Sequence, residues 1–268
     1  MIRNLGKLWA FLKRDFLNEI SYRLGFILQI AGMLLSLLSF YFIAKMVDPA
    51  TEGLDGIRPF EWWLVGMSFQ FYFSTALYSF AAKIRGEQVL GTLEAMLVSP
   101  TPTSMVIFSS AAWDFTYGGL RILLLLGASI GIFGVHLYTN SLPALALGVL
   151  LTMLSSVGLG ILSASFIIYF KRGNPINWVL SGATSLLGNV FIPIKQLPEW
   201  IRPASDLLPA TWSMRVVRGA LLKGESFTEL RDELAVLAIL TAILLPTGLI
   251  CSRYAIRRAK RAGTLIQY

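Results

Sequence analysis

The sequence contains one cysteine, Cys251, and one histidine, His136. A disulfide needs two cysteines and a metal centre needs several ligating side chains close together, so neither is predicted. The sequence also lacks the glycine-rich phosphate loop that ends in Gly-Lys-Ser or Gly-Lys-Thr, and it has no His-Glu-x-x-His motif or Ser-His-Asp set. We therefore expect no catalytic residue, no metal site and no cofactor in this chain. Cys251 is interpreted as a small packing residue and His136 as a loop residue.

Charge is scarce and unevenly placed. Asp, Glu, Lys and Arg make up 14% of the sequence, and none occurs in 24–44, 62–82, 142–170, 175–194 or 234–252. A further apolar stretch, 104–138, contains Asp114 and Arg121. A helix needs roughly 20 apolar residues to cross the hydrocarbon core of a membrane. The sequence therefore predicts an all-α polytopic membrane protein with a single transmembrane domain over 1–268. Its six predicted spans are 24–46, 62–82, 106–136, 142–170, 175–194 and 234–252.

Basic residues gather on one side of these predicted spans. They precede the first span, follow the last, and occupy the connections after the second and the fourth: Arg3, Lys7, Lys13, Arg14, Arg23, Lys83, Arg85, Lys171, Arg172, Arg253, Arg257, Arg258, Lys260 and Arg261. Lys and Arg stay on the cytoplasmic side of membrane proteins. We therefore expect a multi-pass protein of the cell membrane (plasma or inner membrane) with both termini in the cytoplasm. The net charge of +8 has the same explanation, and nucleic-acid binding is not expected.

Residues 1–20 are predicted to form an amphipathic helix that lies on the membrane before the first span. Its apolar stripe has spacings of three and four residues: Leu5, Leu8, Trp9, Leu12 and Phe16. Basic residues lie on the opposite face, which is the arrangement of an interfacial helix. A cytoplasmic helix packed on another protein is the alternative interpretation.

The connection between the second and third predicted spans, 83–103, is the most informative polar segment. A helix over 85–99 would place Glu87, Gly91 and Glu94 on one face and apolar residues on another. Ser99-Pro100-Thr101-Pro102 would end this helix, because proline lacks a donor and disfavours helix in the residue before it. Such a helix either docks on a cytoplasmic partner or is a solvated connector, and periodicity alone leaves both open.

Asp114 and Arg121 are seven residues apart, so they lie on one side of the third predicted span. Ionisable groups inside a membrane are costly and suggest a function. Here both are expected near the cytoplasmic leaflet, where arginine can reach the interface and aspartate can meet water or a basic side chain. We favour a packing or interface role over contact with a substrate.

Two further predictions concern packing and the outer surface. Small residues in the third and fourth spans predict close helix contacts, namely Gly127, Gly131, Gly158 and Gly160. Trp62 and Trp63 begin the second span, where aromatic residues gather at the outer interface. In 195–225, polar breaks alternate with apolar patches, which predicts short outer helices that dip partly into the membrane.

Three segments resemble the permease subunits of type-2 ABC exporters. The stretch Glu87-Gln-Val-Leu-Gly-Thr-Leu-Glu-Ala-Met-Leu-Val-Ser-Pro100 is similar to that family's Glu-x-x-x-Gly-Thr-Leu-Glu stretch between spans two and three. The run Phe191-Ile-Pro, Leu197-Pro-Glu-Trp and Leu208-Pro209 is similar to its outer segment between spans five and six. The N-terminal amphipathic helix resembles its connecting elbow helix. Together with six spans, the resemblance covers nearly the whole chain.

The resemblance implies a half-transporter that is not itself an enzyme. A second permease copy, expected to form a homodimer, and two copies of a cytoplasmic ABC ATPase would complete it, with ATP and magnesium bound by the ATPase. The residues expected to couple to the ATPase are Glu87, Gly91, Thr92 and Glu94. The residues expected in an outer gate are Pro193, Pro198, Trp200, Pro209 and Trp212. The substrate would be a drug, a lipid or a lipid-linked glycan. The permease itself would be in contact with membrane lipid.

An ion-gradient-driven secondary carrier or channel is the main alternative. Such proteins usually have ionisable residues deep in several spans and often contain inverted repeats. Only Asp114 and Arg121 qualify here, both in one span, so we favour the exporter. A membrane scaffold without transport activity is a third possibility.

Overall fold

The computed structural model describes residues 13, 16–17, 21, 23–48, 53–89, 103–170 and 175–261. All regular elements among these residues are helices, which confirms the all-α prediction for this part of the chain. In chain order they are α2 (Arg23–Ala44), α3 (Pro59–Val89), α5 (Thr103–Phe133), α6 (Leu142–Phe170), α7 (Pro175–Leu187), η1 (Ile194–Gln196), α8 (Arg202–Asp206), α9 (Pro209–Arg218), η2 (Gly219–Lys223) and α10 (Arg231–Arg261). Most of the predicted interfacial helix, 1–20, lies outside the described residues.

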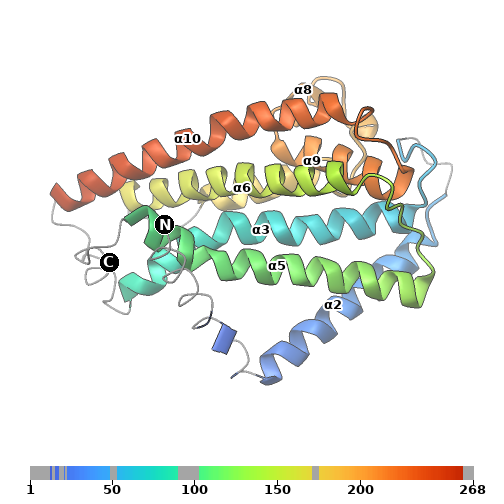
Figure 1. Cartoon of the computed structure of the whole chain (residues 1–268), viewed down its shortest axis with the longest axis horizontal. Coiled ribbons are helices and arrows are strands. Elements are labelled where there is room, and N and C mark those ends of the chain that lie inside the picture. The colour runs from blue at the N-terminus through green and yellow to red at the C-terminus, as the bar shows by residue number, and fades with distance from the viewer. Residues whose placement is uncertain are drawn as a thin grey trace.

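The long helices α3, α5, α6 and α10 run side by side along the long axis of the molecule, and α2 is inclined to them (Figure 1). Among the described residues, four segments are long and apolar enough to cross a membrane: Ile27–Ala44, Trp113–Phe133, Leu142–Phe166 and Arg231–Arg258. Large apolar side chains on the outside of these helices are exposed, including Leu24 and Ile250. The chain is therefore a multi-pass membrane protein, and the six-span layout stays a prediction.

The predicted fifth span, 175–194, is wrong as one continuous helix. Helix α7 ends at Leu187 after 13 residues, which corresponds to a length of roughly 20 Å. Asn189 follows with a φ of 58°, a left-handed conformation that interrupts the helix and that asparagine adopts more readily than most residues. The chain from 188 to 193 is irregular, so the uncharged run in the sequence contains a helix and a turn.

Helix α3 is longer than its predicted span, 62–82. It begins at Pro59 and continues to Val89, so residues 85–89 extend α3 and do not begin a separate helix. The rest of the predicted coupling helix, 90–99, lies outside the described residues. The polar segment expected to dock on a partner therefore follows directly from a single 31-residue helix.

The bundle is closed by a tight crossing of α6 and α10. A Cβ atom added at Gly158 would lie 2.7 Å from the Leu244 carbonyl carbon, and one added at Gly248 would lie 2.5 Å from the Gly158 oxygen. Gly158 thus lies at a close helix contact, as predicted, and Gly160 is buried. No atom lies within 4 Å of a Cβ placed at Gly127 or Gly131, so the predicted contacts of these two glycines are not found within the described chain.

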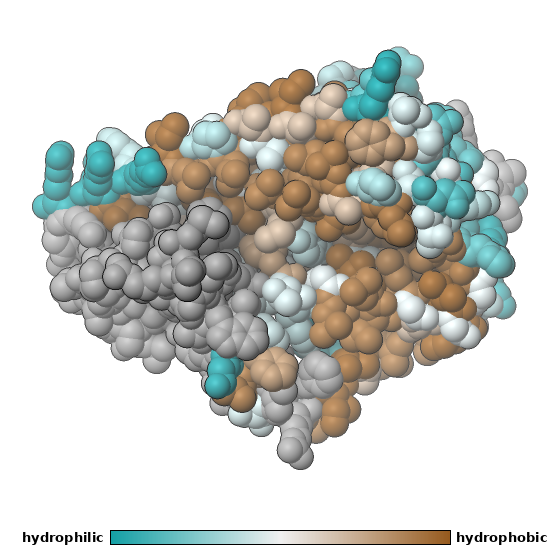
Figure 2. Space-filling model, viewed as in Figure 1, coloured by the Kyte–Doolittle hydropathy of each residue, from teal (hydrophilic) through white to brown (hydrophobic). Residues whose placement is uncertain are grey.

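The hydropathy of the surface changes along the long axis of the molecule. Hydrophobic side chains cover the middle of the molecule, and hydrophilic side chains gather at its two ends (Figure 2). One end contains α8, α9, η2 and the segment 53–58, and we call it the α9 end (Figure 1). The other contains the C-terminal ends of α3, α6 and α10, and we call it the basic end because α10 exposes Arg253, Arg257 and Arg258 there.

Candidate functional site

Arg218, the last residue of α9, is the most enclosed charged side chain at the α9 end, with 2% of its surface exposed. Its guanidinium donates to the carbonyl oxygens of Trp62 (3.0 Å), Val190 (2.7 Å) and Asn189. Its central carbon also lies 3.5 Å from the centre of the Trp62 ring. Arg218 therefore joins the start of α3, the turn after α7 and the end of α9. A planar fork of donors is well suited to several carbonyls at once.

A glycine in α3 makes this junction possible. A Cβ atom at Gly66 would lie 2.1 Å from the Val190 oxygen and 3.0 Å from an Arg218 nitrogen, so only glycine allows this approach. The left-handed Asn189 turns the chain after α7 back toward α3. Beside it, the Trp63 indole nitrogen donates to the Phe191 oxygen at 3.0 Å. Sequence and backbone together bring three carbonyl groups to one point.

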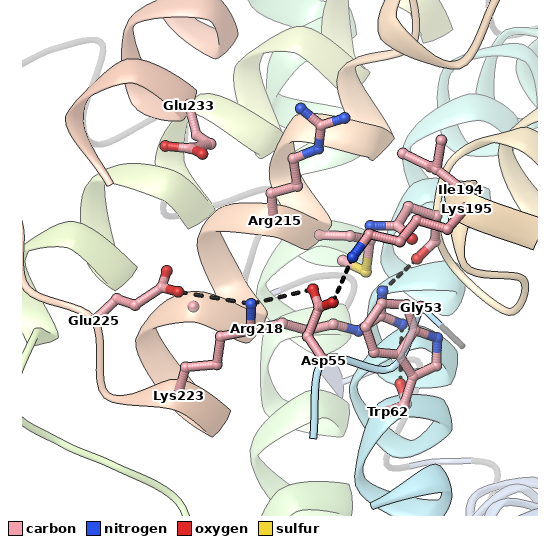
Figure 3. A pocket seen from close by; sticks show the side chains of 13 residues that line it. Gly53, Asp55, Trp62, Ile194, Lys195, Arg215, Arg218, Lys223, Glu225 and Glu233 are labelled. Atoms are coloured by element: carbon pink, nitrogen blue, oxygen red, sulfur yellow. Dashed lines mark hydrogen bonds and ion pairs between the residues drawn. The ribbon is translucent and has the colours of Figure 1, made fainter. Parts of the chain in front are cut away.

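A cavity of ≈ 360 Å³ lies beside Arg218. Its walls come from the segment 53–58, the start of α3, the turn after α7, α9, η2 and α10: Gly53, Asp55, Trp62, Asn189, Ile194, Lys195, Met214, Arg215, Arg218, Gly219, Lys223, Glu225 and Glu233 (Figure 3). The lining is rich in charge of both signs. Such a site suits a polar molecule better than an apolar one.

Most charged residues of this wall form ion pairs. Asp55 accepts from Lys195 at 2.9 Å and from Lys223 at 3.4 Å, and Lys223 also lies 3.7 Å from Glu225 (Figure 3). The hydrogen bond from Lys195 is the main cause that lowers the pKa of Asp55 below its usual value. The charges of both lysines act in the same direction, and partial burial opposes them. These bonds tie the segment 53–58 to η1 and η2.

The predicted outer-gate segment does contain short helices, namely η1, α8 and α9. Pro193 precedes η1, Pro198 lies between η1 and α8, and Pro209 opens α9, where its missing N–H costs nothing. The Trp212 indole donates to the Asp206 oxygen at 2.8 Å, while Trp200 is exposed. Whether these helices enter the membrane, and whether these residues gate a path, stay predictions.

The structure places Asp114 and Arg121 at helix contacts. The Ser79 hydroxyl of α3 donates to Asp114, and the Arg121 Nε lies 3.3 Å from the sulfur of Met33 in α2. The guanidinium of Arg121 is also 5.6 Å from the centres of the Phe71 and Tyr117 rings. Each residue therefore links α5 to a neighbouring helix, which fits the packing role we favoured. A role toward a substrate stays untested.

The structure does not test the predicted coupling residues, because most of them lie outside the described part of the chain. Glu87 belongs to the last turn of α3, and Gly91, Thr92 and Glu94 lie outside the described residues. Within the described residues no group of three or more His, Cys, Asp and Glu side chains is arranged to hold a metal ion.

Sequence reasoning missed the residues around the cavity. Trp62 was interpreted as an interfacial aromatic residue, but it is 4% exposed and packs against Arg218. Arg218 and Asn189 attracted no prediction, because an isolated arginine and an asparagine near span ends are common. The one available signal was Arg218 itself, a lone charge in the run Val216-Val-Arg-Gly-Ala-Leu-Leu222.

The comparisons with known proteins agree with the membrane architecture. No curated protein matches the sequence significantly. A model of the family described as ABC-2 type transporter matches residues 6–222, which is most of the chain and includes α2 to α9. This match includes the predicted coupling segment and most residues of the cavity wall at the α9 end, but not Lys223, Glu225 and Glu233. The chain belongs to the ABC-2 type transporter family and is a transmembrane permease of that family.

Proposed function

We propose that the chain is the membrane subunit of an ATP-driven exporter. It moves a hydrophobic or amphipathic molecule, such as a drug, a lipid or a lipid-linked glycan, out of the cytoplasm or the inner leaflet. The path lies at the contact of two permease copies, and a separate cytoplasmic ABC ATPase supplies the energy. The family match over residues 6–222 carries this proposal. The sequence contains no phosphate loop, so the family's ATP-dependent work requires a partner.

The distribution of charge supports the orientation. Exposed arginines at the C-terminal end of α10 lie at the basic end, together with the end of α3 that carries Lys83 and Arg85 (Figure 1). The α9 end has acids and bases in similar numbers, as in the network around Asp55. By the preference of Lys and Arg for the cytoplasm, the basic end faces the ATPase and the α9 end faces outward.

Helix α3 is suited to transmit force between these ends. It is one helix of 31 residues, about 46 Å long at 1.5 Å per residue, and the predicted coupling segment follows it directly. Along its length it packs against α5 and α6, for example through Tyr72 and Phe115, whose ring centres are 5.9 Å apart. At its far end Arg218 attaches it to α9. A displacement of the coupling segment would therefore move the junction at the α9 end.

The decisive experiment reverses charge at the coupling segment. The permease is purified with its ATPase, and substrate-stimulated ATP hydrolysis is measured in proteoliposomes. We expect Glu87→Lys combined with Glu94→Lys to lower stimulated hydrolysis and transport more than tenfold, because reversed charges at a contact cost a few kcal/mol. Membrane insertion should be unaffected.

A matched double reversal at the α9 end serves as the control. The side chains of Glu199 and Asp232 are 91% and 84% exposed, so Glu199→Lys with Asp232→Lys makes the same change in charge far from the coupling segment. Normal coupling in the first variant would refute the assignment of Glu87 and Glu94. Transport driven by an ion gradient, without ATP or an ATPase, would refute the exporter and favour the secondary carrier.

A further inference from the structure

Arg121 is a charged residue within a membrane-spanning segment, and part of its guanidinium has no partner. It lies in Trp113–Phe133 and is half-buried. Its Nε lies 3.3 Å from the sulfur of Met33, and its guanidinium lies 5.6 Å from the centres of the Phe71 and Tyr117 rings. Among the described residues, no carboxylate pairs with it and no acceptor bonds its terminal nitrogens, Nη1 and Nη2. An unpaired charge in a membrane is costly, so these N–H groups require an acceptor from outside the chain.

A second donor lies beside this guanidinium on α2. The Tyr117 hydroxyl donates to Oε1 of Gln29 at 2.7 Å, and the Gln29 amide nitrogen has no acceptor in the described part of the chain. Gln29 and Met33 are one turn apart on α2, as Tyr117 and Arg121 are on α5. The two contacts therefore lie one above the other, and the amide and the guanidinium are about one helical turn, or 5 Å, apart.

These donors are open to lipid and near the basic end of the span. Arg121 is eight residues from Trp113, where the apolar segment begins, which corresponds to about 12 Å. Long side chains of a helix extend toward its N-terminus, and the contact with the Tyr117 ring places the guanidinium about one turn nearer to Trp113. The neighbouring side chains Leu28 and Leu120 are 62% and 47% exposed. A lipid phosphate at the edge of the hydrocarbon can therefore reach the guanidinium.

We infer that Arg121 and Gln29 bind the phosphate group of an anionic phospholipid between α2 and α5. A guanidinium fork can donate to two oxygens of one phosphate, and the amide of Gln29 can donate to another oxygen. Basic sites between transmembrane helices near the cytoplasmic surface bind anionic head groups in this way. That the lipid belongs to the cytoplasmic leaflet rests on the orientation proposed above. The binding chemistry does not depend on the direction of transport or on the ATPase.

The charges around the site favour an anionic lipid over a zwitterionic one. Asp114 lies on the same side of α5, but it accepts from Ser79 of α3. No carboxylate in the described part of the chain pairs with Arg121 or bonds to Gln29. The site therefore offers donors and a positive charge to a phosphate, and no acid to an ammonium group. Water is the alternative partner of these donors, and it explains no preference among lipids.

The test uses the purified full chain, freed of lipid, in an uncharged detergent and phosphate-free buffer. Binding is measured by native mass spectrometry and by the shift in melting temperature. The probes are dioleoyl phosphatidylglycerol, dioleoyl phosphatidylcholine, dioleoylglycerol and glycerol 3-phosphate. The first two share a phosphate and differ in net charge, the third lacks the phosphate, and the fourth lacks the acyl chains. We expect saturable binding of phosphatidylglycerol that is about tenfold tighter than that of any other probe.

Two variants alter the site in different ways. Arg121→Gln removes the charge and should weaken binding of phosphatidylglycerol about tenfold, as expected for lost hydrogen bonds to a charged group. Gln29→Glu keeps the acceptor of the Tyr117 hydroxyl and places a carboxylate where it can pair with Arg121. It should weaken this binding at least as much and leave the melting temperature of the lipid-free chain unchanged or higher.

Arg257→Gln is the matched control, because it removes the same charge from an exposed position of α10 and should leave the binding unchanged. A chain whose arginine only packs against α2 would lose stability in Arg121→Gln without losing selectivity for phosphatidylglycerol. That result would overturn the inference. If Arg121→Gln does not fold, Gln29→Glu decides, because it keeps the arginine and its contacts.

Other outcomes also decide the matter. Unchanged lipid binding in Gln29→Glu, or equal losses in Arg121→Gln and Arg257→Gln, would overturn the inference. So would equal affinity for phosphatidylglycerol and either of the other two lipids. Binding of glycerol 3-phosphate as tight as that of the lipid would indicate a free anion and overturn the assignment to a lipid. None of these measurements involves transport or ATP, so failure here leaves the proposed exporter untouched.

Discussion

Arg218 and Arg121 are two arginines in a largely apolar chain, and their surroundings differ sharply. Arg218 is 2% exposed, donates to three backbone carbonyl groups and stacks on Trp62. Arg121 is half-buried and contacts the sulfur of Met33 and the faces of two aromatic rings. The first donates to carbonyl groups from two separate segments, α3 and the turn after α7, while the second contacts a sulfur atom and two aromatic rings. Burial and backbone partners, more than charge itself, decide how much each arginine contributes.

The largest predicted effect is the difference between their alanine variants. Arg218→Ala leaves three carbonyl groups without this donor and opens a space beside Trp62, so we expect a loss of about 3–5 kcal/mol in the free energy of unfolding. Arg121→Ala should cost about 1 kcal/mol, the order of a partly exposed cation–π contact. Unfolding in mixed micelles of an uncharged detergent and sodium dodecyl sulfate measures both.

Arg218→Ala is at risk of failing to accumulate in the membrane, so Arg218→Lys is measured beside it. Lysine keeps the charge and loses the planar fork that matches several carbonyls, and we expect an intermediate loss of stability. Equal stability of Arg218→Ala and Arg121→Ala would show that the junction of α3, α7 and α9 does not depend on the guanidinium.

A smaller effect is expected from the glycine that admits the junction. A Cβ at Gly66 would lie 2.1 Å from the Val190 oxygen, so Gly66→Ala must push the turn after α7 away from α3. We expect a loss of about 1–3 kcal/mol, typical of overpacking. The same unfolding assay applies.

Gly127→Ala is the matched control, because no atom of the described chain lies within 4 Å of its Cβ position. Alanine favours helix over glycine by up to about 1 kcal/mol, so this variant should be neutral or more stable. A large loss in assembled transporter but not in the isolated chain would place Gly127 at a contact with another chain. Unchanged stability of Gly66→Ala would contradict the close approach at Arg218.

The contrast between the two arginines also shows what sequence reasoning can reach. Runs without charge predict membrane helices because the hydrocarbon core excludes charge over a known length, and α2, α5, α6 and α10 follow from this rule. The same rule pointed to Asp114 and Arg121, because they interrupt a run. It gave no weight to Arg218, which lies between spans, where an arginine is ordinarily solvated.

Other features were not predictable because they depend on partners distant in the chain. The run 175–194 is uniformly uncharged, yet its helix ends at Leu187. Asn189 then takes a left-handed conformation, and its carbonyl oxygen accepts a hydrogen bond from Arg218, a residue distant in the sequence. Gly127 and Gly158 look alike in sequence, but only Gly158 faces another helix within the described chain. The residues of the cavity wall that carry buried, unpartnered atoms are Trp62, Asn189, Arg218 and Glu233, which belong to four segments of the chain and line one cavity only after folding.

The smallest effect concerns the ion pairs around Asp55, which are more exposed than Arg218. Its pKa is lowered from 3.8 chiefly by the hydrogen bond from Lys195, with the charge of Lys223 adding to it. A carboxyl group with a lowered pKa in the folded protein stabilises it above the unfolded pKa, and this contribution is lost as the pH falls through the folded pKa. The Asp55 side chain is 41% exposed, so we expect less than about 1 kcal/mol at pH 7.

Asp55→Asn isolates this charge, because asparagine also tolerates the left-handed conformation found here, with a φ of 52°. The difference in melting temperature between Asp55→Asn and the unaltered chain should be greatest near neutral pH and shrink to zero below pH 4. It should also shrink in high salt, which screens exposed charges. A difference that grows on acidification would mean that Asp55 is destabilised as an anion, and that Lys195 and Lys223 do not form its main environment. Arg218→Ala is expected to cause a large loss of stability that does not depend on salt. A small, salt-sensitive loss in Asp55→Asn would therefore show that buried hydrogen bonds to the backbone stabilise the α9 end more than its exposed ion pairs do.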